Sequence, residues 1–174
     1  MVTIYGDIWT EFEKRPEAYL VIPTNIGWKH DGSNVMGRGL AKTAAEKFPE
    51  LPEFYGPWCQ KYCTELYVHY GRNVICAPTN PLNEGKPHLS WKNRAKACLV
   101  EESYRQLGDL AQKKGWIILT SLLGAGNGGM RYEKALKLAE DAELPDNVIL
   151  VLLERADLSV LLEVGISKVL RNVA

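Results

Sequence analysis

The chain has 174 residues, and this length predicts a single domain over residues 1–174. Hydrophobic residues make up 46% of the sequence and charged residues 24%, an ordinary globular composition that argues against disorder. Lys and Arg together number 21, as do Asp and Glu, and this balance excludes a generally basic nucleic-acid coat and a polybasic membrane binder.

The sequence carries no sign of secretion, of a membrane span or of a metal. Its first residues lack the charged start and apolar run of a signal peptide. Its most apolar run, at 148–153, is far shorter than the roughly 20 residues that cross a membrane. The four cysteines and three histidines lack the spacing of a zinc module or a disulfide framework. We therefore expect a cytoplasmic monomer with reduced thiols, no metal and no cofactor.

The apolar periodicity alternates between two and 3.6, which indicates alternating strands and helices. Residues 18–23 form a continuous apolar run, as in a strand buried on both faces, and Leu40, Ala44 and Phe48 share one helix face. In chain order we expect strands over 2–5 and 18–23, helices over 40–48 and 53–63, a hairpin of strands 66–70 and 73–77, a long helix after Ser90, a strand over 116–122, a helix over 132–142, a strand over 148–153 and a terminal helix over 157–171 packed on the domain.

This order of elements predicts the α/β class, with a largely parallel sheet. Ligands of such sheets bind beyond the carboxyl ends of the strands, so the loops after residues 23, 77 and 122 are the places to search for chemistry. The loop over 24–39 ends in Met36-Gly37-Arg38-Gly39 and leads directly into a helix. Glycines before a helix N-terminus suit a phosphate, although a plain loop is the alternative.

A second glycine-rich loop, over 123–130, also precedes a helix. It holds Gly124, Gly126, Gly128 and Gly129, which are costly to order unless a ligand or another backbone comes close. Two such loops in one small α/β domain suggest a diphosphate held between two sets of backbone N–H groups. After the first expected strand, Asp7 is either a helix cap or an acceptor for the amino group of a base.

These motifs together resemble a macro domain. Gly6-Asp7-Ile8, Thr24-Asn25, the run 36–41 and the run 123–130 fall in the order of that family and cover roughly residues 2–155. The resemblance implies a three-layer α/β/α sandwich with a mixed, largely parallel sheet and a cleft for ADP-ribose. The expected partner is therefore ADP-ribose or an ADP-ribosylated protein or nucleic acid.

One branch of the family is most similar to this sequence. It includes antitoxin macro domains that remove ADP-ribose from DNA and terminal ADP-ribose glycohydrolases. The features shared with it are Met36 to Ala41, the following Lys47-Phe48-Pro49-Glu50, and the pair Pro78-Thr79. A lysine commonly follows that pair and acts on the distal ribose, whereas this chain has Asn80, which cannot form a Schiff base.

The resemblance also implies site residues. Asp7 would accept a hydrogen bond from the adenine amino group, Ile8 would contact the base through its backbone, and Asn25 would point at the distal ribose. The two glycine-rich loops would hold the diphosphate. The full ADP-ribose set is Asp7, Ile8, Asn25, Val35, Met36, Gly37, Arg38, Gly39, Leu40, Thr79, Gly124, Ala125, Gly126, Asn127, Gly128, Gly129 and Met130.

For catalysis the candidates are Asn25, His30 and Asp31. The adjacent His30 and Asp31 form a titratable pair that could activate water near neutral pH; a solvated loop histidine is the alternative. Tyr132 could stack at the distal ribose or pack in the core. We expect a hydrolase of an ADP-ribose derivative, either an ADP-ribosyl glycohydrolase or an ADP-ribose-1″-phosphate phosphatase. The alternatives are a non-catalytic ADP-ribose reader and a domain for another nucleotide or nucleic acid.

Overall fold

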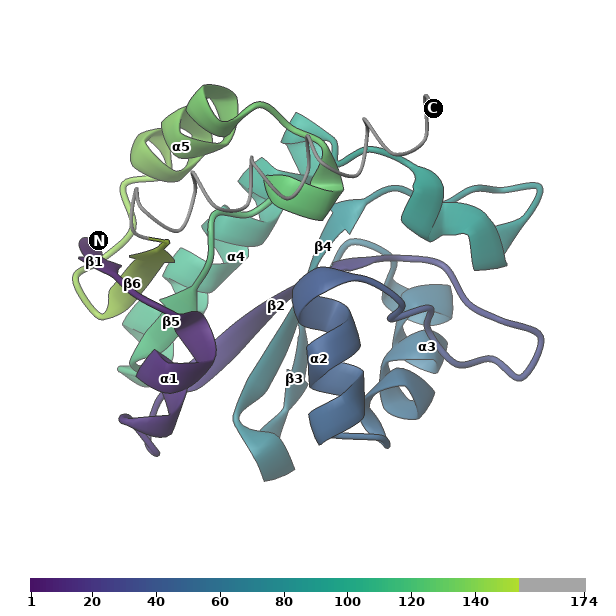
Figure 1. Ribbon diagram of the computed structural model, residues 1–174, viewed down its shortest axis with the longest axis horizontal. Coiled ribbons are helices and arrows are strands. Elements are labelled where there is room, and N and C mark those ends of the chain that lie inside the picture. Colours follow the sequence, from purple (N-terminus) through teal and green to yellow (C-terminus); the bar gives the residue numbers. More distant parts are fainter. Residues whose placement is uncertain (154–174) are drawn as a thin grey trace, which may run out of the picture.

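Short strands and amphipathic helices alternate in the computed structural model, which describes residues 1–153 (Figure 1). Three 3₁₀ helices, η1 to η3, lie between them. The elements are β1 (Val2–Tyr5), α1 (Ile8–Glu13), β2 (Tyr19–Asn25), α2 (Gly39–Lys47), α3 (Leu51–Tyr62), β3 (Tyr67–His69), η1 (Tyr70–Arg72), β4 (Val74–Asn80), η2 (Pro87–Lys92), α4 (Ala97–Lys114), β5 (Ile118–Thr120), η3 (Gly126–Gly128), α5 (Tyr132–Asp141) and β6 (Val148–Leu152).

The strands and helices expected within the described residues are confirmed, with changes at their ends. The hairpin forms from β3 and β4, which pair antiparallel around η1. The strand expected over 116–122 is limited to β5, and the helix expected after Ser90 begins only at Ala97, since η2 precedes it. The short helix α1 was not expected. The expected terminal helix over 157–171 lies outside the described residues.

The six strands form one mixed sheet in the order β1-β6-β5-β2-β4-β3. All neighbours pair parallel except β3 and β4, which confirms the largely parallel sheet. The pairing of β2 differs on its two sides. It pairs with β4 from Leu20 to Asn25 but with β5 only at Tyr19↔Ile118 and Leu20↔Leu119. The carboxyl-terminal half of β2 therefore parts from β5.

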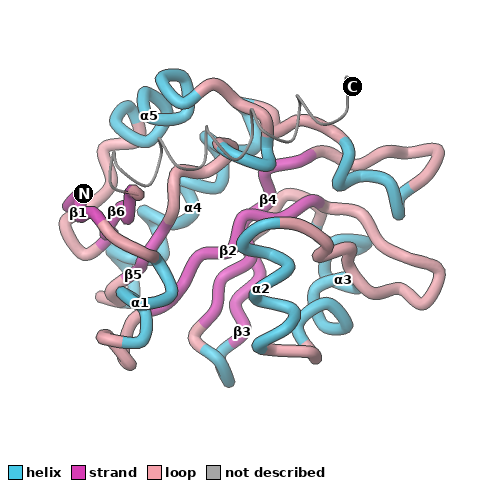
Figure 2. Tube along the Cα trace, viewed as in Figure 1, coloured by secondary structure: helices cyan, strands magenta, loops and turns pink. Residues whose placement is uncertain are grey.

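Helices cover both faces of the sheet, as the expected three-layer sandwich requires (Figure 2). Successive side chains of a strand point to opposite faces. On β2, Leu20 and Ile22 belong to the core that includes residues of α1, α2 and α3, whereas Val21 belongs to the core formed with α4 and α5. Each face of the central strands is thus buried, which explains their continuous apolar sequence.

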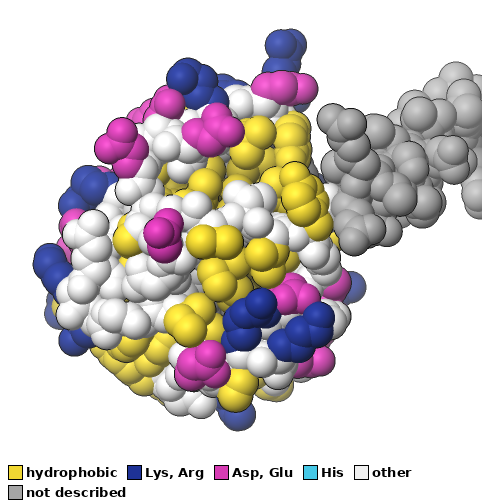
Figure 3. Space-filling model, turned by 90° about the vertical axis from the view of Figure 1, so that its left-hand side faces the viewer, with side chains coloured by type: hydrophobic (Ala, Val, Ile, Leu, Met, Phe, Trp, Pro, Cys, Tyr) yellow, Lys and Arg dark blue, Asp and Glu magenta, His cyan; other side chains and the backbone are white. Residues whose placement is uncertain are grey.

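The strand β1, which is outermost in the sheet formed by residues 1–153, carries exposed hydrophobic side chains. Val2 and Tyr5 on this strand are exposed, and Figure 3 shows hydrophobic side chains gathered on this side of the molecule among charged groups. Within residues 1–153, no helix combines the length and apolar character that a membrane span requires.

Candidate functional site

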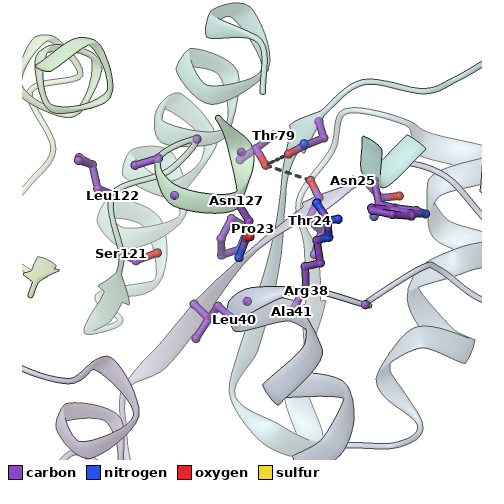
Figure 4. A pocket seen from close by; sticks show the side chains of 18 of the residues that line it. Pro23, Thr24, Asn25, Arg38, Leu40, Ala41, Thr79, Ser121, Leu122 and Asn127 are labelled. Carbon is purple, nitrogen blue, oxygen red and sulfur yellow. Dashed lines mark hydrogen bonds between the residues drawn. The ribbon is translucent and has the colours of Figure 1, made fainter. Parts of the chain in front are cut away.

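A cleft of about 380 Å³ opens at the carboxyl ends of the central strands, where β2 and β5 part (Figure 4). One side is formed by the end of β2 and the start of α2, the other by the segment after β5 and by η3. The end of β6 closes one extremity. The residues that line the cleft are Pro23, Thr24, Asn25, Val35, Gly37, Arg38, Gly39, Leu40, Ala41, Thr79, Asn80, Trp91, Ser121, Leu122, Gly124, Ala125, Gly126, Asn127, Gly128, Tyr132, Val151, Leu152 and Leu153.

The first glycine-rich loop meets the second across this cleft. Gly39 begins α2 with a φ of +50°, a left-handed conformation that glycine adopts without strain. A Cβ on Gly39 would lie only 2.5 Å from Nδ2 of Asn127, because the Asn127 side chain rests against the Gly39 backbone. Arg38 makes no side-chain cap to α2, so the first N–H groups of this helix, which begins in the cleft lining, have no partner within the helix.

The second glycine-rich loop forms the short helix η3, bracketed by left-handed glycines. Gly124, Gly126 and Gly129 have φ values of +82°, +59° and +71°. Gly129 donates its N–H to the carbonyl of Gly126, and Met130 donates to the carbonyl of Gly124, so the loop is closed by its own backbone. Because η3 begins at Gly126, the first N–H groups of its turn have no partner within it and can serve an anion.

Polar side chains at the ends of β2 and β4 are held by a local hydrogen-bond network. Asn25 Nδ2 donates to the carbonyl of Val35 at 2.7 Å, and its Oδ1 accepts from the N–H of Gly27 at 2.9 Å. Thr79 Oγ1 lies 3.1 Å from the carbonyl of Thr24 and 2.7 Å from Oδ1 of Asn80 (Figure 4). The amide of Asn25 keeps a second N–H for a ligand.

Asn80, the residue after the pair Pro78-Thr79, is engaged at both ends of its side chain. Its Oδ1 bonds the Thr79 hydroxyl, and its Nδ2 donates to the carbonyl of Asn93. Asn80 is also almost fully buried. It therefore fastens the 81–96 segment to β4, and its amide supplies neither a nucleophile nor a base.

The lining of the cleft is poor in titratable groups. Arg38 is its one fully charged side chain and Tyr132 its one other ionisable side chain among the described residues. Below the floor, the Thr24 hydroxyl bonds the Tyr55 hydroxyl at 2.8 Å, and complete burial raises the pKa of Tyr55 well above its ordinary value. Recognition in this cleft thus depends on backbone N–H groups, amides and hydroxyls.

Most residues assigned to ADP-ribose from the sequence are brought together here. From the expected set, the cleft is lined by Asn25, Val35, Gly37, Arg38, Gly39, Leu40, Thr79, Gly124, Ala125, Gly126, Asn127 and Gly128. Met36 and Ile8 are instead buried in the core, and Gly129 and Met130 lie behind η3, outside the lining.

Asp7 caps helix α1. Its Oδ1 accepts from the N–H of Thr10 at 2.8 Å and from the Thr10 hydroxyl at 2.9 Å. The cap alternative raised by the sequence is therefore realised. Asp7 does not line the cleft, but the N–H of its neighbour Gly6 donates to the carbonyl of Leu152, which does. The second carboxylate oxygen of Asp7 accepts no hydrogen bond from residues 1–153.

His30 and Asp31 lie outside the cleft lining. His30 lines a separate pocket with Trp28, Lys29, Gly32, Gln60, Pro87 and His88. The Asp31 carboxylate accepts from the hydroxyl and the N–H of Ser33, and these bonds hold the pKa of Asp31 below its ordinary value. Asp31 thus closes the turn that carries His30.

Several lining residues escaped the sequence analysis. Ser121, Leu122 and Leu153 lie within two residues after the end of a strand, so the rule that ligands bind at carboxyl ends could have identified them. Trp91 comes from η2, in a segment where the sequence shows only clustered charges. No pattern in the sequence marks it.

Comparison with known proteins identifies the fold. No family model and no curated protein matches the chain. Solved structures do match, and among them is the macrodomain of Thermus aquaticus DarG, with 24% identity, a TM-score of 0.64 and coverage of 88% of this chain and 97% of that one.

Two further structures extend the comparison. Thermosipho africanus DarTG in complex with ADP-ribose is 22% identical with a TM-score of 0.64, covering 90% of this chain and 42% of that one. A mutant of the Oceanobacillus iheyensis macrodomain is 19% identical with a TM-score of 0.60, covering 98% of this chain and 92% of that one.

Proposed function

Because this chain has the macrodomain fold, we propose that it binds ADP-ribose in the cleft between β2 and β5 and hydrolyses an ADP-ribose derivative. The observation that carries the binding proposal is the meeting of the two glycine-rich loops at Gly39 and Asn127. Backbone N–H groups from both sides of the cleft can there surround a diphosphate, and no basic surface is needed. The DarTG structure, which holds ADP-ribose, has a similar fold.

The ends of the cleft suggest how the ligand would lie. The apolar end at Val151, Leu152 and Leu153, next to Asp7, suits the adenine, with the free oxygen of Asp7 as acceptor for the amino group. The polar end, at Asn25, suits the distal ribose. The diphosphate would then lie between the loops in the middle.

For the chemistry we infer hydrolysis at the distal ribose, either of a glycosidic bond or of a 1″-phosphate. The motifs shared with the ADP-ribose-removing branch support this. The loops would fix the diphosphate, and the unused N–H of Asn25 would bind a ribose hydroxyl and so position the ribose. Water would then attack C1″ as the linked group departs, or attack the phosphorus of the 1″-phosphate as the ribose oxygen departs. Because Asn80 cannot act as a base and His30 lies in a separate pocket, the water would be activated by a phosphate of the substrate.

A non-catalytic ADP-ribose reader is the second candidate. The observation that favours it is that no carboxylate, histidine, lysine or cysteine lines the cleft within residues 1–153. A reader needs only the two loops and the two ends described above.

Calorimetric titration with ADP-ribose, ADP and AMP, followed by product analysis, tests both candidates. We expect ADP-ribose to bind at least about tenfold more tightly than AMP, since only ADP-ribose reaches both ends of the cleft. Release of phosphate from ADP-ribose-1″-phosphate, or of free ADP-ribose from an ADP-ribosylated protein or oligonucleotide, would establish a hydrolase. Binding without release from these substrates would establish a reader, and equal affinities for AMP and ADP-ribose would refute the binding mode.

A further inference from the structure

A second pocket, of about 270 Å³, lies next to the cleft and has a different chemical character. It is lined by Trp28, Lys29, His30, Gly32, Gln60, Pro87 and His88. The rings of His30 and His88 approach one another, with their centroids 6.3 Å apart and their planes inclined by 23°. Lys29, Gln60 and the two imidazoles all offer N–H donors, and no carboxylate from the described part of the chain belongs to the lining.

The turn that carries Lys29 and His30 is built to hold its shape. Trp28 and Asn34 form an antiparallel bridge, and Lys29 donates its N–H to the carbonyl of Ser33 at 2.8 Å. Gly32 has a φ of +83°, which glycine allows, and the carbonyl of Gly32 packs so closely on α3 that a Cβ at Gly56 would lie 1.9 Å from it. Asp31 closes the turn through Ser33.

The pocket shares a wall with the polar end of the cleft. Asn25 lines the cleft and Trp28 lines the pocket, and between them Gly27 packs against η2 so tightly that a Cβ there would lie 2.0 Å from the carbonyl of Pro87. On the other segment His88 lines the pocket and Trp91 the cleft. Both segments extend away from the sheet on the α3 side of the molecule in Figure 1.

The donors of this pocket suit an anion and oppose a cation. The ammonium group of Lys29 repels a metal ion, and among residues 1–153 no three His, Cys, Asp or Glu side chains converge to bind one. Asp31 is the nearby carboxylate, and its Oδ1 already accepts two bonds from Ser33. Imidazole, ammonium and amide N–H groups together match the oxygens of a phosphate.

From these observations we propose that the pocket between Lys29, His30, Gln60 and His88 is a phosphate subsite beside the distal end of the cleft. It takes either a phosphate of the substrate, attached to the distal ribose directly or through the group linked there, or free inorganic phosphate. The first case rests on the proposed function, because it requires ADP-ribose in the cleft. The second does not.

The three histidines of the chain allow a direct test. The imidazole resonances are recorded in ¹H–¹⁵N correlation spectra while inorganic phosphate replaces chloride at constant ionic strength. The titration is run at about pH 6, below the pKa of histidine in model peptides. We expect the resonances of His30 and His88 to shift together along one saturable curve. His69 serves as the internal control, since it lies away from the pocket against Tyr67 and Glu50.

Matched lysine variants test the charge. Lys29→Gln is expected to weaken phosphate binding at least about tenfold, because it removes one charge-assisted hydrogen bond. Lys61→Gln is the control, because Lys61 lies beside Gln60 in sequence but its ammonium lies 4.8 Å from the centroid of the Tyr62 ring. Equal effects of the two variants would overturn the subsite.

The source of the phosphate follows from a second titration. Tighter binding of ADP-ribose-1″-phosphate than of ADP-ribose, lost in Lys29→Gln, would assign the subsite to the substrate. A response to inorganic phosphate without that preference would assign it to the free ion. No shift of His30 and His88 with either phosphate source, or a shift with zinc chloride alone, would overturn the proposal. If ADP-ribose does not bind while phosphate does, the proposed function fails and the subsite stands.

Discussion

The guanidinium of Arg38 lies 4.4 Å from the centroid of the Trp91 ring. This contact joins the first glycine-rich loop to η2, two segments that are far apart in the sequence and that both line the cleft. A cation over the face of an indole contributes roughly 0.5–1 kcal/mol at an exposed site. Trp91 therefore forms a wall of the cleft and also holds Arg38 beside it.

Replacing Trp91 tests this wall. Trp91→Ala is expected to weaken ADP-ribose binding at least about tenfold, because it removes both the aromatic surface and the partner of Arg38. Trp91→Phe should retain most of the affinity. The control is Lys92→Ala, since Lys92 lies 5.4 Å from the same ring centroid but does not line the cleft. Calorimetry measures all three; an unchanged affinity in Trp91→Ala would contradict the assignment.

Two substitutions at Asp7 separate its two roles. Asp7→Ala removes the helix cap and the carboxylate, whereas Asp7→Ser keeps a capping oxygen and removes only the carboxylate. We expect both to weaken ADP-ribose binding, and only Asp7→Ala to lower the free energy of unfolding, by about 1 kcal/mol. Denaturant unfolding and calorimetry on the same samples give the answer. An unchanged affinity of Asp7→Ser for ADP-ribose would show that the Asp7 carboxylate does not bind the adenine.

Gly27→Ala tests the wall between the cleft and the second pocket. The new Cβ would lie 2.0 Å from the carbonyl of Pro87 and 2.4 Å from Oγ of Ser90, so the two segments must separate. We expect the free energy of unfolding to fall by about 2 kcal/mol or more, which corresponds to a fall of roughly 4–8 °C in Tm. Gly71→Ala is the matched control, because a Cβ there meets no atom of the described residues within 4 Å. Similar Tm values for the two variants would show that the segment of Gly27 and η2 can move apart at little cost in stability.

The thiols should divide into two classes. Burial raises the pKa of Cys59 to about 12 and that of Cys76 well above its ordinary value, whereas Cys63 and Cys98 are exposed. Since the thiolate is the reactive form, we expect iodoacetamide at about pH 8 to modify Cys63 and Cys98 quickly and the other two only after unfolding. Mass spectrometry locates the adducts. Rapid modification of Cys59 in the folded protein would contradict its burial.

The same buried groups predict how stability depends on alkaline pH. Cys59 and Tyr104 both have a pKa raised by burial to about 12, so the folded chain keeps protons that the unfolded chain releases. Stability must then fall as the pH rises above the unfolded values, from about pH 9 upward. Denaturant midpoints at about pH 8 and about pH 10.5 measure the loss. The decrease in stability between these two pH values should be smaller in Tyr104→Phe. An identical decrease would show that Tyr104 does not contribute to the pH dependence.

The sequence predicted the strands, the α-helices other than α1 and both glycine-rich loops because periodicity and glycine clusters are local signals. It could not predict which residues of other loops would reach the cleft. Trp91 lines the cleft only because Gly27 lets η2 pack against the segment after β2. His30 lies in the neighbouring pocket because Gly32 and Gly56 bring its turn onto α3. Such placements depend on contacts between distant segments, which a local pattern does not encode.

β2 and β5 share two register pairs, fewer than any other neighbouring strands of the sheet, whereas β2 and β4 share six. A molecule bound in the cleft would contact both sides of this junction and thus act as a non-covalent cross-link between two half-sheets. Its binding energy would then oppose separation of β2 from β5. Amide hydrogen exchange in β2 and β5 should accordingly slow when the cleft is filled, while exchange at the outer strands β1 and β3 changes little.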